Sequence, residues 1–267
     1  METPAFQIFE KTGSVAITSL EQWFARAPPR GREKQWKDKR SAKELARRWV
    51  GAFLPDEVVA ALDTQPALRG FAPKRGLAEY VTKLDHFGPG RVHDLLLEGA
   101  ADGAMTVIGI EGKADEKFGQ TVEKALQEVE GVPSDLPARI DRLCKALFGK
   151  GPADEPSLLR LYYQLVYAAA ACLIEANQRR CQSAVFLTHE FKSTGLNGAS
   201  LARNQEGLNN FVRAVSRGST ASVPHNGVVG PFRVAGDPAR KGFPEISASI
   251  DFYIGRATHD LDGATAK

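Results

Sequence analysis

Residues 91–113 constrain the fold of this chain more than any other stretch, because they have the pattern of two strands joined by a tight turn. The first run, residues 92–97, is apolar apart from two polar residues, and the second, residues 104–110, is small, apolar and partly β-branched, as strands usually are. Between them lies a segment bracketed by glycines, residues 99–103. The pattern predicts a β-hairpin.

Period-two alternation in the second strand predicts that Glu111 and Lys113 share one face. If the hairpin closes, Asp94 lies on the neighbouring strand close to Glu111. Two nearby carboxylates repel each other unless a cation lies between them, and hard oxygen ligands suit Mg²⁺ or Mn²⁺. We therefore expect Asp94, Glu111 and the Gly112 carbonyl to hold a metal ion. Lys113 would orient a water molecule or neutralise charge on a phosphate.

This arrangement resembles the PD-(D/E)xK nucleases, the restriction-endonuclease-like superfamily. Asp94 is followed seventeen residues later by Glu111-Gly112-Lys113, although the residue before the aspartate is His93 rather than the family's frequent proline. The resemblance implies a mixed β-sheet core of αβββαβ order, flanked by helices. It also implies that Asp94, Glu111 and Lys113 are catalytic, with Mg²⁺ or Mn²⁺ as cofactor.

Two other acid-x-Lys triplets compete with this assignment, Asp115-Glu116-Lys117 and Glu190-Phe191-Lys192. The first is expected to lie beyond the strand, and the second ends another strand-like run but has no visible hairpin partner. The alternative for Glu111 and Lys113 is a solvated ion pair at a strand end.

The net charge of +3 is unevenly distributed along the chain. Residues 26–48 carry ten Lys or Arg against three acids, and the three tryptophans lie in or beside this segment. Basic residues with interleaved aromatic rings suit binding to a phosphate backbone, so we expect Arg40, Lys43 and Arg47 to contact nucleic acid. The alternative is that Trp23 and Trp49 pack in the core and the basic residues are only solvated.

Five helices are expected before the hairpin and immediately after it: residues 20–25, 42–53 (capped by Ser41 with Glu44), 56–62, 77–84 and 121–130. Helices at 137–148, 157–177 and 204–216 follow, with strands at 183–191, 228–234 and 246–254. We interpret the chain as one α/β domain. Residues 1–75 would be a mostly helical basic decoration, 76–192 the nuclease core, and 193–267 a C-terminal helix and strands.

Two further residues are candidates for the site. The nuclease fold commonly places an acid on the helix before its sheet, which makes Glu79 a candidate third acid or else a solvent-facing helical residue. Some nucleases carry Gln-x-x-x-Tyr on a later helix, and Gln164 precedes Tyr167 by three residues instead of four. Gln164 is therefore either a site residue or a core amide.

The chain lacks the glycine-rich phosphate loops of nucleotide-dependent enzymes and the nucleophile elbow of acyl hydrolases. Its three cysteines lack metal-ligand spacing, and no signal peptide or membrane span is indicated, so a cytoplasmic location is expected. The stretches Ala27-Pro28-Pro29 and Arg40 to Ala46 are also similar to uncharacterised bacterial proteins.

The sequence thus predicts a metal-dependent phosphodiesterase that cleaves DNA in preference to RNA, of the restriction, defence or repair type. The alternative is a non-catalytic module of the same fold that binds nucleic acid or another protein. A monomer and a homodimer both remain open.

Overall fold

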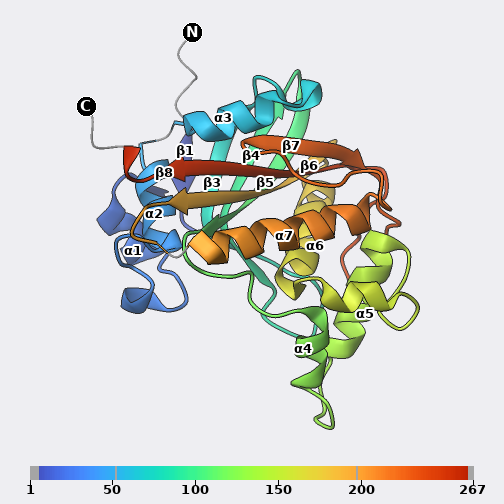
Figure 1. The fold of residues 1–267 in the computed structure, drawn as a ribbon. Coiled ribbons are helices and arrows are strands. Elements are labelled where there is room, and N and C mark those ends of the chain that lie inside the picture. Colours follow the sequence, from blue (N-terminus) through green and yellow to red (C-terminus); the bar gives the residue numbers. More distant parts are fainter. Residues whose placement is uncertain (1–5, 52, 197, 264–267) are drawn as a thin grey trace.

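A computed structural model of the chain describes residues 6–51, 53–196 and 198–263. A single eight-stranded mixed sheet forms its centre, with strand order β2-β1-β3-β4-β5-β6-β8-β7 (Figure 1). The strands are β1 (Gln7–Phe9), β2 (Ala16–Ile17), β3 (Ala72–Thr82), β4 (Arg91–Ala101), β5 (Ala104–Lys113), β6 (Ser183–Lys192), β7 (Gly227–Phe232) and β8 (Asp251–Asp260). Strands β3, β4 and β5 form an antiparallel meander, whereas β5, β6 and β8 run parallel. The predicted α/β class is confirmed.

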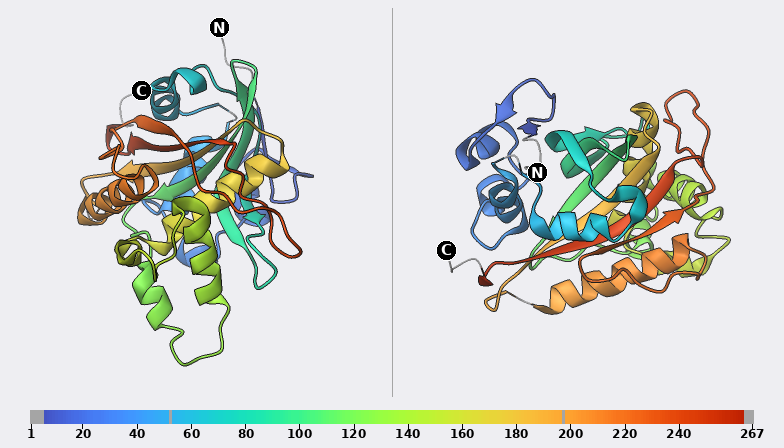
Figure 2. Two further views of the ribbon diagram at one scale, coloured as in Figure 1. Left: turned by 90° about the vertical axis from the view of Figure 1, so that its right-hand side faces the viewer. Right: turned by 90° about the horizontal axis from the view of Figure 1, so that it is seen from above.

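Helices cover both faces of the sheet (Figure 2). They are α1 (Leu20–Arg26), α2 (Ser41–Trp49), α3 (Asp56–Asp63), α4 (Val122–Gln127), α5 (Leu136–Phe148), α6 (Tyr163–Gln178) and α7 (Gly198–Val215), with short 3₁₀ turns at Arg32–Lys34, Pro66–Leu68 and Pro156–Arg160. Helices α1 to α3 pack on one face, and α4 to α7 pack on the other. Both faces of the central strands are therefore buried, which is why their middle sections are continuous apolar runs, such as Leu95 to Leu97 and Ala184 to Leu187.

The predicted hairpin is confirmed by β4 and β5, which pair in register from Leu95 with Ile110 to Ala101 with Ala104. Asp102 and Gly103 form the turn, and both have positive φ, at 46° and 77°. A two-residue hairpin loop needs this backbone because its twist matches that of the strands, and Asp-Gly adopts it readily.

The predicted helix at residues 77–84 is wrong, since residues 77–82 lie in β3 and residues 83 and 84 follow it. Three strands, β1, β2 and β3, were missed, so the N-terminal region contributes to the sheet as well as to the helices. The strand expected at 246–254 lies instead at Asp251–Asp260, where pairing with β6 and β7 decides its position.

Helix α2 begins at Ser41 and ends at Trp49, earlier than predicted, and residue 52 of the predicted helix lies outside the described residues. The predicted Ser41 cap is wrong, because Arg40 occupies the cap position. The Ser41 hydroxyl donates instead to Glu116 at 2.9 Å, and this bond joins α2 to the loop after β5.

The remaining helices overlap their predicted positions, but α6 begins later than predicted, at Tyr163 after the Pro156–Arg160 turn, and α7 begins six residues earlier than predicted, at Gly198. Helix α6 is buried along almost its whole length between the sheet and its neighbouring helices. Within the described ranges, none of the helices has the length and apolarity needed to cross a membrane.

Candidate active site

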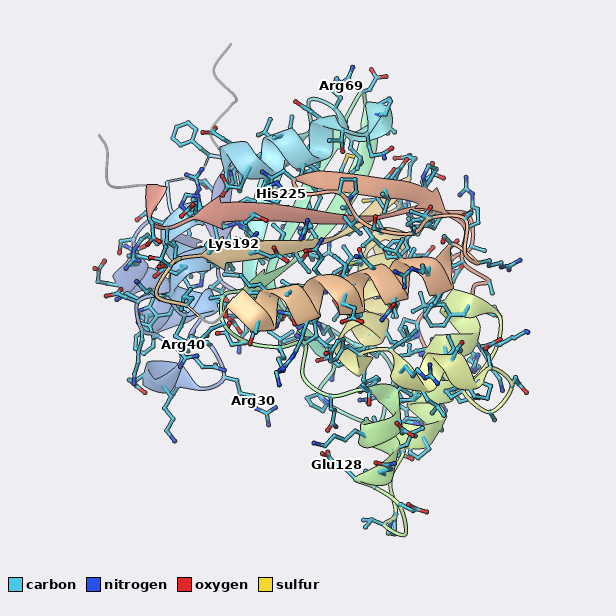
Figure 3. All side chains as sticks on the ribbon, in the orientation of Figure 1. Arg30, Arg40, Arg69, Glu128, Lys192 and His225 are labelled. Carbon is cyan, nitrogen blue, oxygen red and sulfur yellow. The ribbon has the colours of Figure 1, made fainter. Side chains whose placement is uncertain are left out.

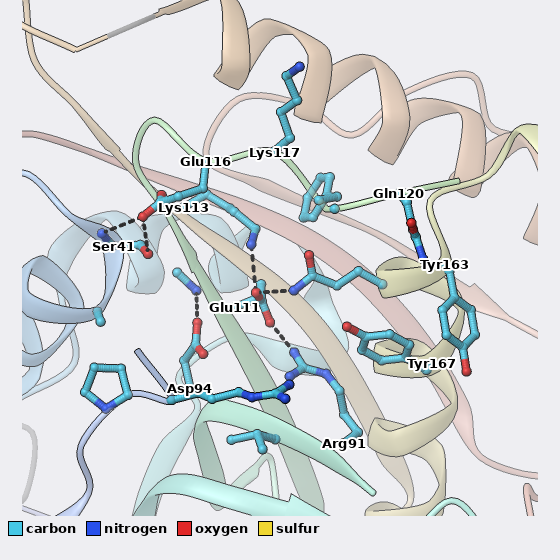
Figure 4. A pocket seen from close by; sticks show the side chains of 18 of the residues that line it. Ser41, Arg91, Asp94, Glu111, Lys113, Glu116, Lys117, Gln120, Tyr163 and Tyr167 are labelled. Atoms are coloured by element: carbon cyan, nitrogen blue, oxygen red, sulfur yellow. Dashed lines mark hydrogen bonds and ion pairs between the residues drawn. The ribbon is translucent and has the colours of Figure 1, made fainter. Parts of the chain in front are cut away.

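A cavity of about 630 Å³ lies where β5 ends, between the start of α2, the start of α6 and the loop after β5. Five residues expected from the sequence line it: Glu79, Asp94, Glu111, Lys113 and Gln164. They come from β3, β4, β5 and α6, so the fold brings together side chains that are up to 85 positions apart (164 − 79) in the chain. Figure 4 shows Asp94, Glu111 and Lys113 directed into the same space.

Glu111 is the centre of the hydrogen-bond network in this cavity. Its Oε1 accepts from Nζ of Lys113 at 2.8 Å and from Nε2 of Gln164 at 2.5 Å, and its Oε2 pairs with Arg91. Glu111 and Lys113 are only 4% and 6% exposed, so the alternative of a solvated surface pair is wrong. Through this bond Gln164 contacts Glu111, as expected for a residue of the site and not for an amide that only packs in the core. The two nearby cations hold the pKa of Glu111 below its usual value despite burial, which on its own would raise it.

Arg91 also lines the cavity and was not predicted from the sequence. It is the first residue of β4, is 7% exposed, and its guanidinium lies over the ring of Tyr167 at 5.3 Å from the ring centroid. Its Nε is buried and has no hydrogen-bond partner among the described residues. A basic residue at the start of the strand, three positions before Asp94, was the signal in the sequence.

Asp94 lies beside Glu111, but its hydrogen-bond partner is a backbone N–H and not Arg91 or Lys113. Its Oδ2 accepts from the backbone N–H of Gly112 at 2.8 Å. Burial and the charge of Glu111 raise the pKa of Asp94 to about 7, against the smaller opposing effects of Arg91 and Lys113. Near neutral pH the carboxyl is therefore divided between its protonated and charged forms.

Glu79 reaches the cavity from a strand, not from the predicted helix. Its φ of +51° is left-handed, which is rare and costly for a residue with a side chain. Leu77 and Tyr80 contact the same core although they are an odd number of positions apart, so the alternation of β3 shifts at Glu79. Burial, followed by the charges of Asp94 and Glu111, raises the pKa of Glu79 to about 9.

The donor set fits a hard divalent cation that takes only a few of its ligands from the protein. Asp94 and Glu111 supply carboxylate oxygens, and the pKa of Asp94 is raised by burial and then by the negative charge of Glu111, which a cation would offset. Mg²⁺ keeps several waters and takes one or two protein carboxylates, so this pair is sufficient. Within the described part of the chain, no cluster of three or more His, Cys, Asp or Glu side chains is arranged to hold a metal ion, so Glu79 does not complete a cage.

The basic segment lies beside the cavity, and its charges are partly neutralised. Arg40 pairs with Asp115 at 2.7 Å, while Lys43 and Arg47 both pair with Asp38, at 2.8 and 2.7 Å. These three cations do not line the cavity, whereas Arg30, Ser41 and Ala42 of the same region do. Figure 3 shows Arg30 and Arg40 projecting on the same side of the molecule.

Trp23 and Trp49 are buried in the core, as the alternative interpretation held, and are not available for stacking on bases. Of the competing triplets, Asp115 and Lys117 lie in the loop after β5, beyond the strand as expected. Glu190 and Lys192 end β6 and line a different, second cavity.

Neither a curated protein nor a solved structure matches this chain. Residues 16–260 match the model of a family described as a domain of unknown function, DUF6946. The match spans 245 of the 267 residues (260 − 16 + 1) and includes every candidate site residue named above. The chain therefore belongs to the DUF6946 family.

Proposed function

We propose that this protein is a metal-dependent phosphodiesterase that cleaves DNA, with a restriction-endonuclease-like core. One observation carries the proposal: Asp94, Glu111 and Lys113, from the two strands of one hairpin, line a single cavity at the end of the sheet. An ordinary structural ion pair needs neither a second carboxylate nor an open cavity beside it.

The order of elements supports the same assignment. Helix α3 precedes the meander β3-β4-β5, helices α4, α5 and α6 follow it, and β6 then lies parallel to β5. This order is compatible with an αβββαβ core to which further helices, and strands on both edges of the sheet, are added.

The residues would divide the chemistry among themselves. Asp94 and Glu111 would hold Mg²⁺ or Mn²⁺, which when bound supplies Lewis-acid stabilisation and a more acidic water. The carboxylate of Glu111 raises the pKa of Lys113, so the Lys113 ammonium keeps its proton near neutral pH. Lys113 would therefore stabilise negative charge on the phosphate and orient water, and would not act as a base.

Arg91 and Gln164 would act as positioning residues. Both donate hydrogen bonds to the Glu111 carboxylate, Arg91 from β4 and Gln164 from α6, and so fix its orientation. Arg91 also lines the cavity, where its guanidinium would bind a phosphate oxygen.

The second candidate, a non-catalytic nucleic-acid-binding or protein-interaction module, is favoured by one observation. Both oxygens of Glu111 already accept from side chains, three donors in all. A cation would have to displace or share at least one of these contacts, and a site that cannot do so would bind ligand without cleaving it.

A nicking and linearisation time course on plasmid DNA with Mg²⁺ or Mn²⁺ tests the proposal. We expect Lys113→Met to lower the cleavage rate by about 100-fold or more, because one preorganised donor is typically worth this much. Lys117→Met is the matched control, since Lys117 lines the same cavity but is exposed. Equal rates for wild type and Lys113→Met would contradict the mechanism, and no cleavage of any DNA or RNA by wild type would favour the module.

A further inference from the structure

A second cavity, of about 450 Å³, lies at the carboxyl ends of the parallel strands β6 and β8. Glu190 and Lys192 of β6, Arg256 of β8 and the first two turns of α7 form its walls. Crevices beyond the carboxyl ends of parallel strands are common places for ligands in α/β sheets. The residues proposed above for phosphodiester cleavage do not line this cavity.

Arg256 is the unusual residue of this cavity. It is 4% exposed, and its Nε is buried with no hydrogen-bond partner within the described chain. Its nearest carboxylate oxygen, Oε2 of Glu190, lies 3.8 Å from Nη1, which is too far for a hydrogen bond. A buried guanidinium with unmet donors is costly, so its presence calls for a ligand that satisfies them.

The surroundings of Arg256 favour an anion. Lys192 lines the same cavity, and Lys39 lies beside it, with Nζ 3.1 Å from Oγ of Ser193. Burial, together with the positive charges of Arg256 and Lys192, lowers the pKa of His225, which Figure 3 shows near this end of the sheet.

The acids of the cavity have partners within the protein. Burial raises the pKa of Glu190 and so disfavours its charged form, and its Oε2 accepts from the Thr258 hydroxyl at 3.2 Å. Asp262 accepts from the Ser193 hydroxyl at 2.8 Å and from the Thr194 N–H at 2.6 Å. Asp260 accepts from the N–H of Asp262 at 2.9 Å. The positive end of the α7 dipole adds to the field of the cations.

We propose that this second cavity is a binding site for a phosphate group, held by the guanidinium of Arg256 with Lys192 as the second cation. A guanidinium presents a planar fork of donors that matches two phosphate oxygens, whereas the Lys192 ammonium adds a point charge. The site does not depend on the function proposed above, because it shares no residue with the first cavity.

Calorimetric titration of the full chain with inorganic phosphate, in buffer free of phosphate and sulfate, tests the site. We expect saturable binding to wild type that is weakened about tenfold or more in Arg256→Met. The reason is that the free energy of a charge-assisted hydrogen bond corresponds to a change of about this size in Kd. Lys192→Met should weaken binding less. Arg233→Met is the matched control, since Arg233 is 61% exposed, pairs with Asp251 and lies outside the cavity.

Thermal unfolding separates loss of the site from loss of the fold. In the absence of phosphate, Arg256→Met should melt at or above the temperature of wild type, because it removes a buried guanidinium whose one ion pair, with Glu190 at 3.8 Å, includes no hydrogen bond. Phosphate should raise the melting temperature of wild type and of Arg233→Met but not of Arg256→Met. Absence of saturable phosphate binding to wild type, or unchanged affinity in Arg256→Met, would overturn the proposal.

Competition identifies the source of the phosphate group once Arg256-dependent binding is established. The competitors are a 5′-phosphorylated trinucleotide and the same trinucleotide without its terminal phosphate, both tested with EDTA present. Competition by both supports a backbone phosphodiester as the occupant. Competition by the phosphorylated form alone supports a terminal phosphate, and competition by neither supports a small free phosphate compound.

Discussion

The side-chain amide of Gln164 donates to Oε1 of Glu111 at 2.5 Å, so helix α6 contributes a hydrogen bond directly to the carboxylate at the end of β5. Together with Arg91 and Lys113, this bond surrounds Glu111 with three donors. A buried carboxylate held in this way is fixed in orientation before any ligand arrives. That is the condition under which a site stabilises charge without reorganising.

Glu111→Gln should destabilise the fold by about 3–5 kcal/mol, because it leaves the buried charges of Arg91 and Lys113 without their carboxylate. Urea unfolding in EDTA measures the change. The matched control is Glu190→Gln, which is equally buried but should cost much less, because its cation Arg256 lies 3.8 Å away and makes no hydrogen bond to it. A double variant with Arg91→Met should be less destabilised than the sum of the single variants. Strict additivity would contradict the buried ion pair.

The stability conferred by Asp94 should fall as pH rises. Its pKa is raised from 3.8 to about 7, so the folded state holds a proton that the unfolded state has already released. The contribution is fully present below about pH 4 and is lost as pH approaches and passes 7. Relative to wild type, Asp94→Asn should therefore gain roughly 4 kcal/mol between these limits, since one pKa unit corresponds to 1.4 kcal/mol. Urea unfolding in EDTA across this range checks the prediction, and a constant difference between the two proteins would contradict it.

Binding of Mg²⁺ near pH 7 should release protons. A ligating carboxylate must be deprotonated, and Asp94, with a pKa of about 7, is partly protonated at that pH. Calorimetric titrations in two buffers of different ionisation enthalpy measure the number of protons released. Asp94→Asn should release fewer protons and bind the ion more weakly. Identical heats in the two buffers for wild type would show that Asp94 is not a ligand.

Position 79 should favour glycine over alanine, in contrast to an ordinary strand interior. The φ of Glu79 is +51°, a conformation that glycine adopts freely and alanine only with strain. We expect Glu79→Gly to be more stable than Glu79→Ala by about 1 kcal/mol. The same pair of substitutions at Val81, which lies in β3 outside this kink, provides the control and should favour alanine. A preference for alanine at position 79 would contradict the left-handed backbone.

Replacement of Arg40, Lys43 and Arg47 by alanine should weaken DNA binding and flatten its dependence on salt. Each phosphate contact contributes about 0.9 to the slope of log K against log salt, so the slope should fall by at most about 3. The fall should be smaller than this limit, since all three side chains also pair with acids of the protein. The control triple is Arg69, Lys74 and Arg180, at the opposite end of the sheet. An unchanged slope in the first triple would place the binding surface elsewhere.

Local sequence patterns were sufficient to predict the hairpin and the placement of three site residues. Two apolar runs around an Asp-Gly turn have one favourable pairing, and once that register is set, alternation puts Glu111 and Lys113 on one face with Asp94 on the next strand. The helices α1, α3 and α5 likewise follow from local signals, such as the Ser19 cap and the left-handed Gly149 after α5. These features depend on contacts between residues close in the chain.

The surroundings of those residues depend on how the strands and helices pack together. The segment around Glu79 has the composition of a helix, yet pairing with β4 makes it a strand, and the left-handed backbone at Glu79 turns its carboxyl into the cavity. Arg91 and Gln164 became partners of Glu111 because β4 and α6 pack against the end of β5. The same packing buries Glu111 and Lys113, and their burial distinguishes them from an ion pair on the solvated surface. Local pattern fixes which face of a strand a side chain occupies, whereas the partners and the solvent exposure of that face depend on segments distant in the chain.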